Sequence, residues 1–336
     1  MNLRHFTIIC GLLFAAPLQG GEIQRFRYES PQMGTTFSIT LYAETEQLAE
    51  RAVTAAFERV AHLNTLMSDY DPKSELMQLC SKNKTTLAGP QKVSAELFYV
   101  LQKCTALSQL SEGAFDASIG PLSRIWRTAR KEKKLPPAET IQTALTRMGY
   151  RNVKLNPKDR TVELLVPGMQ LDLGGIAKGY AADEAIATLK KFNISIALVA
   201  ASGDIATMGI PPDSKGWKID IAPPVGSTDK RTVLLKEMAV STSGDSFQFL
   251  EIDGKRYSHL IDPRTGYGIE GRRSVTVIAP RGIDADSYTK MASIWAPEKA
   301  IAAIEKIPGM ECSISLMVGD KETTVQTKGF ANFLAK

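Results

Sequence analysis

The sequence is poor in the residues from which metal centres and disulfide frameworks are built. It contains three histidines and four cysteines in 336 residues, with no Cys-x-x-Cys pair and no cluster of histidines and cysteines. A zinc site is therefore not predicted. Three cysteines, Cys80, Cys104 and Cys312, follow the N-terminal segment, and because their number is odd they cannot all pair with one another. The sequence does not indicate which two would pair, if any do.

The sequence also has no clear membrane-spanning run near its start. The apolar run Phe6–Ala16 has roughly half of the ~20 residues that a spanning helix needs. It follows a basic start at Arg4 and precedes small residues at Gly20–Gly21, which is the three-part layout of a secretory signal. We therefore expect residues 1–20 to be a signal peptide that directs export. Cys10 lies inside the apolar run, where a lipidated cysteine would follow a small residue at its end, so a lipid anchor is not expected.

Neither sign of charge dominates the chain. The formal net charge is +5, and removal of residues 1–20 takes Arg4 away and leaves +4. A concentrated basic run lies at 127–134, but no aromatic residue is interleaved with it to stack on bases. Such a run is typical of a solvated helix end or loop, so a nucleic-acid partner is not predicted. With 43% hydrophobic and 23% charged residues, the chain has the composition of a globular protein.

Apolar periodicity predicts a mixture of helices and strands. Residues 48–66 carry an apolar residue every three to four positions, which indicates a long amphipathic helix, and Ser94 is a candidate N-cap for a second helix. Strands are expected at 37–43, 161–166, 194–201, 217–223 and 274–280, and a closing helix at 297–307. The elements show neither a regular strand–helix alternation nor a short repeat. We therefore predict an α+β fold built from layers of sheet and helix.

A glycine turn that leads into a helix is the first candidate site. In the stretch LDLGGIAKGYAAD, a short apolar strand ends at Asp172, Gly174 and Gly175 allow a tight turn, and Lys178 lies in the first helical turn. Unpaired N–H groups at a helix N-terminus favour a phosphate, and the lysine would add a positive charge. A plain strand-to-helix corner with a solvated lysine is an equally good interpretation. The spacing is not Gly-x-Gly-x-x-Gly, so a Rossmann dinucleotide site is not supported.

Polar residues that follow other strands suggest further parts of a site. Asp204 follows two small residues at the end of a strand and could accept a hydrogen bond from a ligand, although a plain turn explains this stretch equally well. Asp284 and Asp286 are carboxylates of the kind that Mg²⁺ accepts, although either could instead be the N-cap of the next helix. His259, in the stretch YSHLIDPRTG, could be a base, a metal ligand or a polar residue beside a hairpin. Taken together, these residues favour metal-assisted phosphoryl chemistry.

As an ordered set, these stretches resemble the ApbE family of FAD:protein FMN transferases. The matching segments are MGTTFSI (33–39), MSDYDPKSEL (67–76), GAFDASIGPL (113–122), LDLGGIAKGYAAD (171–183), STSGD (241–245), SHLIDPRTG (258–266) and 274–287. The resemblance implies an exported bacterial protein of the periplasm or cell envelope. It also implies that residues 21–336 form two intertwined subdomains related to the T-fold, with FAD bound in the cleft between them.

The resemblance implies an activity and a set of site residues. Members of the family cleave the FAD pyrophosphate, release AMP and join FMN as a phosphoester to a threonine or serine hydroxyl of an acceptor, typically a membrane-associated electron-transfer subunit. The positions that match FAD contacts are Met33, Tyr70, Ala114, Phe115, Asp116, Asp172 and Lys178. The backbone carbonyl of Gly175 and the carboxylate of Asp286 match Mg²⁺ ligands. Because a hydroxyl is a weak nucleophile at neutral pH, we expect His259 to accept its proton while Asp262 positions the ring or the loop.

One position departs from the family pattern. Many relatives have a threonine four residues after the aspartate that matches Asp286, whereas this chain has Lys290 there and Thr289 about 100° away around the helix. A lysine at i+4 could pair with Asp286 and supply positive charge where the ion would lie. We therefore expect weak or absent magnesium dependence. Two alternative functions stay open, a periplasmic FAD pyrophosphatase that releases FMN and AMP, and a non-catalytic flavin-binding protein.

Overall fold

The computed structural model describes residues 22–244, 249–252 and 254–335. The predicted signal peptide lies outside these residues. The α-helices are α1 (Glu46–Met67), α2 (Glu75–Lys82), α3 (Ala95–Leu110), α4 (Gly120–Glu132), α5 (Ala138–Leu145), α6 (Ala177–Lys191), α7 (Gly282–Ile294) and α8 (Pro297–Ile304), and short 3₁₀ helices are η1 (Ala117–Ile119), η2 (Tyr150–Asn152) and η3 (Phe330–Phe333). In the described part of the chain, no helix is both long enough and apolar enough to span a membrane.

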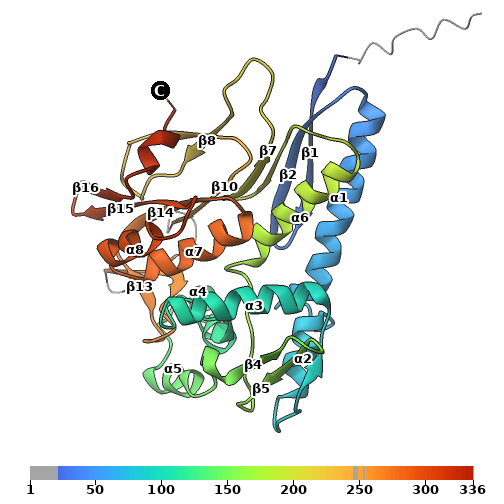
Figure 1. Cartoon of the computed structure of the whole chain (residues 1–336). Helices are drawn as coiled ribbons and strands as arrows, with labels where there is room; N and C mark the ends of the chain where they lie inside the picture. The colour runs from blue at the N-terminus through green and yellow to red at the C-terminus, as the bar shows by residue number, and fades with distance from the viewer. Residues whose placement is uncertain (1–21, 245–248, 253, 336) are drawn as a thin grey trace, which may run out of the picture.

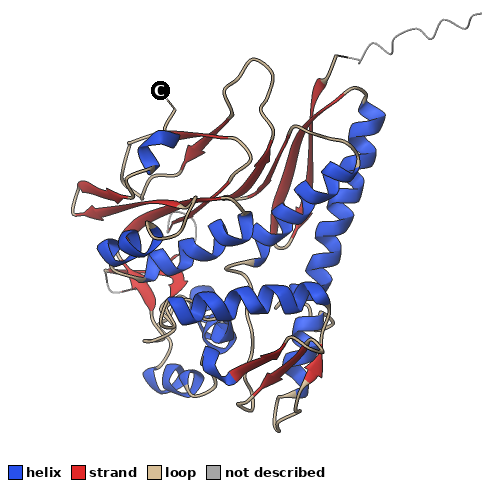
Figure 2. Ribbon diagram, in the orientation of Figure 1, coloured by secondary structure: helices blue, strands red, loops and turns tan. Residues whose placement is uncertain are grey.

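An eight-stranded antiparallel sheet forms the upper part of the molecule (Figure 1). Its strands, in spatial order, are β1 (Gln24–Gln32), β2 (Thr35–Ala43), β6 (Ala197–Ala201), β7 (Asp204–Met208), β10 (Ala239–Gly244), β14 (Arg272–Ala279), β15 (Glu311–Val318) and β16 (Lys321–Gln326). Helices α1, α6, α7 and α8 pack against one face of this sheet (Figure 2). The layer arrangement confirms the predicted α+β class.

The smaller elements lie around this layer pair. A two-stranded ribbon, β8 (Trp217–Ile221) and β9 (Arg231–Leu235), shares a hydrophobic cluster with residues such as Val240 and Ile278 of the large sheet. The lower part contains α2 to α5 with two three-stranded sheets (Figure 1). These sheets are β3 (Gln91–Lys92), β5 (Thr161–Leu164) and β4 (Val153–Asn156), and β11 (Phe249–Ile252), β12 (Lys255–Ile261) and β13 (Gly268–Glu270).

Alternation of side chains on the strands explains how the core forms. Along β7, Ala206 packs into the main cluster on the helix side while Ile205 packs into the cluster on the opposite side. The main cluster continues from the sheet and α1 down into the lower part, where Leu76 of α2 and Leu97 of α3 belong to it. Side chains from the upper and lower parts therefore share one continuous apolar core.

Several turns meet at one edge of the large sheet and position the candidate site. Met33 and Gly34 form the two-residue turn between β1 and β2, both with positive φ, at 49° and 73°. Because Phe37 of β2 pairs with Ala201 of β6, this turn lies at the same end of the sheet as the tight turn between β6 and β7. Asp204 begins β7 at that end, opposite Ser241 of β10.

Most expected elements are present, and some details differ. The strands expected from alternation correspond to β2, β5, β6, β8 and β14, and Ser94 caps α3 by accepting a hydrogen bond from the Leu97 N–H. The helix expected to close the chain is α8, but β15, β16 and η3 follow it. Cys80, Cys104 and Cys312 are all buried free thiols in the structure.

Candidate active site

The glycine turn before α6 is held by its own aspartate. The Asp172 carboxylate accepts a hydrogen bond from the Gly174 N–H at 2.8 Å, and α6 begins three residues after Gly174. Lys178 lies in the first turn of α6, and its Nζ reaches back to the Gly174 carbonyl at 3.3 Å. The turn therefore places a lysine ammonium group next to the start of a helix, as predicted for a phosphate site.

This lysine and three other charged side chains form a compact cluster. The Lys178 Nζ lies 2.8 Å from Asp204 Oδ2 and 3.7 Å from Asp286 Oδ2. The Lys290 Nζ lies 2.6 Å from the other oxygen of Asp286, whose side chain is completely buried. The Gly179 N–H at the start of α6 donates to Asp286 at 3.0 Å. Elements far apart in the sequence, α6, β7 and α7, thus bring two cations and two anions together.

Lys178 and Asp204 keep each other charged by mutual attraction, although both groups are buried. Burial lowers the pKa of Lys178, but the neighbouring carboxylates of Asp204 and Asp286 outweigh it, so the net shift is upward. Burial raises the pKa of Asp204, but the ammonium groups of Lys178 and Lys290 outweigh it, so its net shift is downward. Both Lys178 and Asp204 are therefore ionised at neutral pH.

Hydroxyl groups from β10 and α7 complete the cluster. The Ser241 hydroxyl donates to Asp204 at 2.5 Å, and the Ser243 hydroxyl donates to Thr289 Oγ1 at 3.0 Å. The Lys290 ammonium donates to both Ser243 and Thr289 at 3.0 Å. Both serines belong to β10, so the central sheet holds their hydroxyl groups in place.

The three positions predicted around a metal ion do converge. A Cβ built on Gly175 would lie 3.1 Å from Lys290 Cγ, and Lys290 contacts Asp286 directly. In the described ranges, no group of three or more histidine, cysteine, aspartate or glutamate side chains is arranged to hold a metal ion. Neither Asp284 nor Asp286 caps α7. The first two N–H groups of this helix, on Gly282 and Ile283, donate to Asp183 of α6 instead. Asp286 is therefore available to the cluster.

A second cluster lies on the other side of the glycine turn. The Arg127 guanidinium of α4 bonds to Asp69 at 2.6 Å and to Asp172 at 3.1 Å, and it stacks 4.1 Å from the centre of the Tyr70 ring. Burial, followed by the nearby Asp172 carboxylate, raises the pKa of Asp69. The Tyr70 side chain is 75% exposed, which leaves the outer face of its ring open to a ligand. The expectation that the basic run is merely solvated is wrong for Arg127.

The remaining predicted FAD contacts occupy buried or half-buried positions. Ala114 and Phe115 are buried, and Phe115 lies beside Gly175, with its Cε2 3.5 Å from a Cβ built there. Both Asp116 carboxylate oxygens are bonded within the protein, to the Ser118 N–H and hydroxyl and to the Tyr150 N–H. Burial raises the pKa of Asp116. Asp116 thus organises its own loop, and its contact with FAD stays a prediction.

His259 lies on the central strand of a small sheet that packs against α7. Its strand β12 pairs with β13 through an irregular register between Tyr257 and Ile261, and His259 is half-buried at this bulge. The following turn is fixed by Asp262, whose carboxylate forms a two-pronged ion pair with Arg264. Trp126 of α4 anchors the end of the turn with a 2.8 Å hydrogen bond to the Gly266 carbonyl. The role of Asp262 in positioning the ring or the loop stays a prediction.

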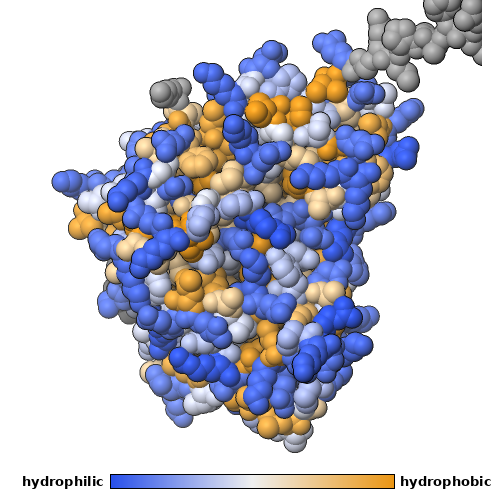
Figure 3. All heavy atoms as spheres, in the orientation of Figure 1, coloured by the Kyte–Doolittle hydropathy of each residue, from blue (hydrophilic) through white to orange (hydrophobic). Residues whose placement is uncertain are grey.

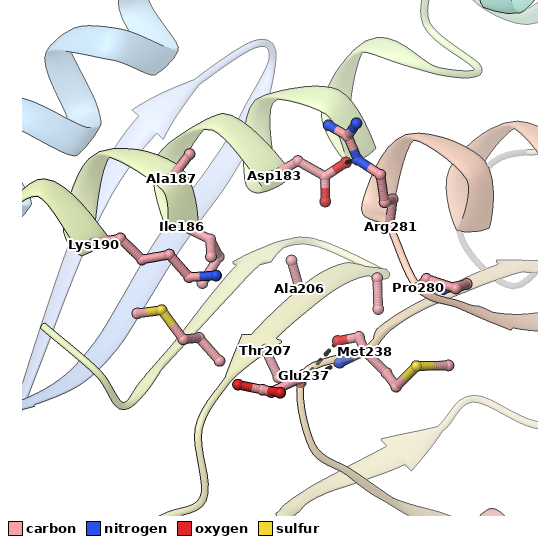
Figure 4. Close-up of a pocket in the computed structure, with 12 residues that line it drawn as sticks. Asp183, Ile186, Ala187, Lys190, Ala206, Thr207, Glu237, Met238, Pro280 and Arg281 are labelled. Atoms are coloured by element: carbon pink, nitrogen blue, oxygen red, sulfur yellow. Dashed lines mark hydrogen bonds and ion pairs between the residues drawn. The ribbon is translucent and has the colours of Figure 1, made fainter. Parts of the chain in front are cut away.

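A separate cavity of about 240 Å³ lies between α6 and the sheet (Figure 4). Figure 4 shows Asp183 and Arg281 facing each other at its rim, with Lys190 extending from α6 along the opposite side. None of the predicted site residues lines it. On the molecular face seen in Figure 3, charged and polar residues dominate, and apolar residues appear as scattered patches.

Sequence reasoning missed Arg127 and gave Ser243 and Thr289 no role at the site. A usable signal for Arg127 was the adjacent buried Trp126, which places the arginine at the margin of the apolar face of α4. The two aspartates that it joins, Asp69 and Asp172, both lie in segments with apolar neighbours and need a cation there. Pairing between distant segments gives no local pattern, so the partners themselves could not be read from the sequence.

The comparison with known proteins decides the family. The model of the ApbE family matches residues 33–314. The chain belongs to the ApbE family. FAD:protein FMN transferases of Klebsiella pneumoniae (strain 342) and Treponema pallidum (strain Nichols) are similar to it. The first is 31% identical over 84% of this chain and 86% of the relative, and the second is 31% identical over 90% and 87%.

Solved ApbE structures share the fold. The apo form of the Pseudomonas stutzeri flavinyl transferase ApbE superposes with a TM-score of 0.80 at 28% identity, over 93% of this chain and 97% of that one. The flavin transferase ApbE of Vibrio cholerae gives a TM-score of 0.81 at 27% identity, over 93% and 100%. The predicted ApbE-like α+β fold is therefore confirmed.

Proposed function

We propose that this chain transfers the FMN moiety of FAD to a threonine or serine hydroxyl of an acceptor protein and releases AMP. The observation that carries this proposal is the convergence of Lys178, Asp204, Asp286 and the start of α6 in a chain whose relatives are FAD:protein FMN transferases. In the reaction, the acceptor oxygen forms a bond to the phosphorus on the FMN side. The bond from that phosphorus to the bridging oxygen breaks, and AMP leaves with that oxygen.

The charge distribution suits this displacement. In-line phosphoryl transfer depends mainly on positioning and on neutralising charge that develops on the phosphate oxygens. Lys178 supplies a permanent ammonium at the N-terminal end of α6, where the helix dipole also favours an anion. Asp204 and Asp286 hold this ammonium in place, so it needs no reorganisation when the pyrophosphate arrives.

The flavin side of the site is assigned to the second cluster. We expect the isoalloxazine ring to lie against the exposed face of Tyr70, which Arg127 backs from the other side. Phe115 and Gly175 are close enough to each other to form part of the same wall. Met33 lies on a turn at the same end of the sheet as Asp204. The FAD contacts of these residues, and of Ala114, Asp116 and Asp172, are part of the proposal.

His259 is proposed as the base that accepts the proton of the acceptor hydroxyl. Its strand packs against α7, the helix that carries Asp286, and an imidazole has a pKa suited to proton transfer near neutrality. The variant His259→Ala should lose FMN transfer by at least about 10². FAD binding, measured by quenching of flavin fluorescence, should survive. Transfer at a near-normal rate by this variant would reject the base assignment.

The acceptor is proposed to be a membrane-associated redox subunit, as the family resemblance implies, and to be exported, because residues 1–20 of this chain have the layout of a signal peptide. The decisive experiment co-expresses the full chain with a candidate acceptor that carries a threonine or serine target. A flavin-fluorescent gel band and an acceptor mass increased by one FMN would support transfer. Loss of both signals when the target residue is changed to alanine is the control. Export is checked by fractionation of cells that express the full chain.

Two other activities use the same site and are separated by one assay. Incubation of the protein with FAD in the absence of an acceptor should release little AMP from a strict transferase. Rapid AMP release without an acceptor would instead favour a pyrophosphatase. Tight FAD binding without AMP release in either condition would favour a non-catalytic flavin-binding protein.

A further inference from the structure

Lys290 fills the position at which the family resemblance implies a magnesium ion. Its Nζ lies 2.6 Å from Asp286 Oδ1, 3.0 Å from Ser243 Oγ and 3.0 Å from Thr289 Oγ1. An ammonium group has three N–H donors, so these three oxygens satisfy all of them. The aliphatic part of the side chain lies against Gly175, as the 3.1 Å approach of a built Cβ to Lys290 Cγ shows. The lysine therefore lies between Gly175 and Asp286.

The residues at this position do not fit magnesium. Mg²⁺ requires oxygen ligands at about 2.0–2.1 Å in octahedral geometry. Here the oxygens surround the Lys290 nitrogen at 2.6–3.0 Å, and the carboxylate of Asp286 already bonds to the ammonium and to the Gly179 N–H. The Thr289 hydroxyl donates to the Asp286 backbone carbonyl at 2.6 Å, so it does not substitute for the threonine that relatives have one position later.

We propose that the ammonium of Lys290 replaces the divalent cation, so that FMN transfer by this chain needs no metal ion bound between Gly175 and Asp286. The inference deepens the proposed function and rests on it for the identity of the substrate. The pyrophosphate of FAD then lies near two ammonium groups, Lys178 and Lys290, balanced by two carboxylates, Asp204 and Asp286. Lys290 acts on it through its charge, because its three N–H donors are already bonded within the protein. A divalent ion in place of Lys290 would leave this cluster with one more positive charge.

The test compares Lys290→Thr with Lys290→Met. The threonine variant removes the ammonium and restores a hydroxyl one helical turn after Asp286, so it should gain Mg²⁺ binding. The methionine variant removes the same charge but offers only a thioether, which is a poor magnesium ligand. Isothermal titration with MgCl₂ should show binding to Lys290→Thr alone, and Mg²⁺ should raise the thermal midpoint of that variant alone. Quenching of FAD fluorescence reports whether each variant keeps a folded flavin site.

Activity supplies a second readout. The unmodified chain should transfer FMN at the same rate in EDTA and in MgCl₂, whereas Lys290→Thr should depend on Mg²⁺ by at least about 10², the typical effect of one transition-state charge contact. Mg²⁺ binding by the unmodified chain, with inactivation by EDTA that Mg²⁺ reverses, would overturn the inference. So would a Lys290→Thr variant that binds FAD but gains no Mg²⁺ binding. If the calorimetry agrees with expectation but no acceptor is ever flavinylated, the proposed function fails while the metal inference stands.

Discussion

At the scale of single residues, the site depends on buried ion pairs whose partners come from different segments. Asp204 has a side chain that is only 7% exposed and lies 2.8 Å from Lys178. Removing one partner of a buried pair leaves the other charge uncompensated, which typically costs 3–5 kcal/mol. Asp286 remains as a second carboxylate at 3.7 Å from Lys178, so the cost here should fall at the low end of that range.

We therefore predict that Asp204→Asn lowers the free energy of unfolding by about 3 kcal/mol at pH 7. The pKa of Asp204 is lowered in the folded state from its ordinary 3.8, so its contribution is present above pH 3.8 and is lost as the pH falls further. The difference between the two proteins should therefore be constant from pH 7 to about pH 4 and shrink below it. Urea unfolding at a series of pH values measures this difference.

The matched control is Asp229→Asn. Asp229 also forms an ion pair, with Arg231, but the Asp229 side chain is 56% exposed. Exposed pairs contribute about 0–1 kcal/mol, so this variant should change little at any pH. An Asp204 effect no larger than the Asp229 effect, or one that grows on acidification, would contradict the role assigned to the buried pair.

The sequence showed individual site residues better than it showed their partners. Lys178, Asp286 and His259 stand in motifs whose local chemistry is visible, and the structure places Lys178 and Asp286 in one cluster. Arg127 was missed because a charge run is usually solvated, and its two partners lie 58 and 45 positions away in the chain. Long-range pairing depends on the tertiary arrangement, which no local pattern specifies.

At the scale of elements, the crossing of α6 and α7 aligns the site. A Cβ built on Gly179 would lie 2.1 Å from the Gly282 carbonyl oxygen and 2.7 Å from Asp286 Cβ. Only glycine allows this approach, which also lets the Gly179 N–H donate to Asp286 at 3.0 Å. The two helices can therefore share one carboxylate because each has a glycine at the crossing, Gly179 of α6 and Gly282 of α7.

We predict that Gly179→Ala destabilises the protein by about 3 kcal/mol or more and weakens FAD binding. Alanine would gain roughly 1 kcal/mol in helix propensity, but the clash is with backbone atoms that cannot rotate away. Chemical unfolding and flavin fluorescence titration measure the two effects. Lys191→Ala, at an exposed position of the same helix, should stay within about 0.5 kcal/mol of the unmodified chain. A stabilised Gly179→Ala variant would show that the helices can separate.

Elements with a strong local period were predictable, and those defined by distant contacts were less so. β2 and α1 have clear periods of two and of three to four residues, and the structure confirms both. The start of α7 was not predictable, because its capping carboxylate comes from Asp183 on α6. The aspartates near the start of α7 pointed to a local cap that the structure does not use.

At the scale of the whole molecule, the strand order places the site but cannot be read from the sequence. The order β2-β6-β7-β10-β14 joins segments from 35 to 279, and it brings Asp204 beside Ser241. The main apolar cluster then joins this sheet to α2 and α3 of the lower part. The Lys178 cluster and the Arg127 cluster meet at the Asp172–Gly174 turn, because Arg127 bonds to Asp172 and Lys178 bonds to the Gly174 carbonyl. FAD bound there would therefore contact both the upper and the lower part of the molecule.

The three tryptophans test this coupling because each belongs to a different apolar cluster. Trp295 lies in the main cluster, Trp217 in the cluster with the β8–β9 ribbon, and Trp126 in the cluster under the His259 strand. Fluorine NMR of protein labelled with 5-fluorotryptophan gives one signal for each, assigned by single replacements with phenylalanine. We predict a single unfolding midpoint in urea for all three signals. The main cluster and the Trp217 cluster share the large sheet, and the Trp126 cluster is joined to the main cluster through η1, which has Ala117 in one and Ile119 against the other, and through the contact of β12 with α7.

Saturation with FAD should then raise the three midpoints together. A ligand that binds only the native state at about 100 times its Kd adds about 2.7 kcal/mol to stability, and in a cooperative molecule every reporter gains the same amount. Equal shifts would show that the flavin site and the His259 strand form one folding unit. A Trp126 signal that melts earlier and does not shift with FAD would place His259 on an independently opening segment. The proposed base would then reach the acceptor by a local motion and not from a fixed position.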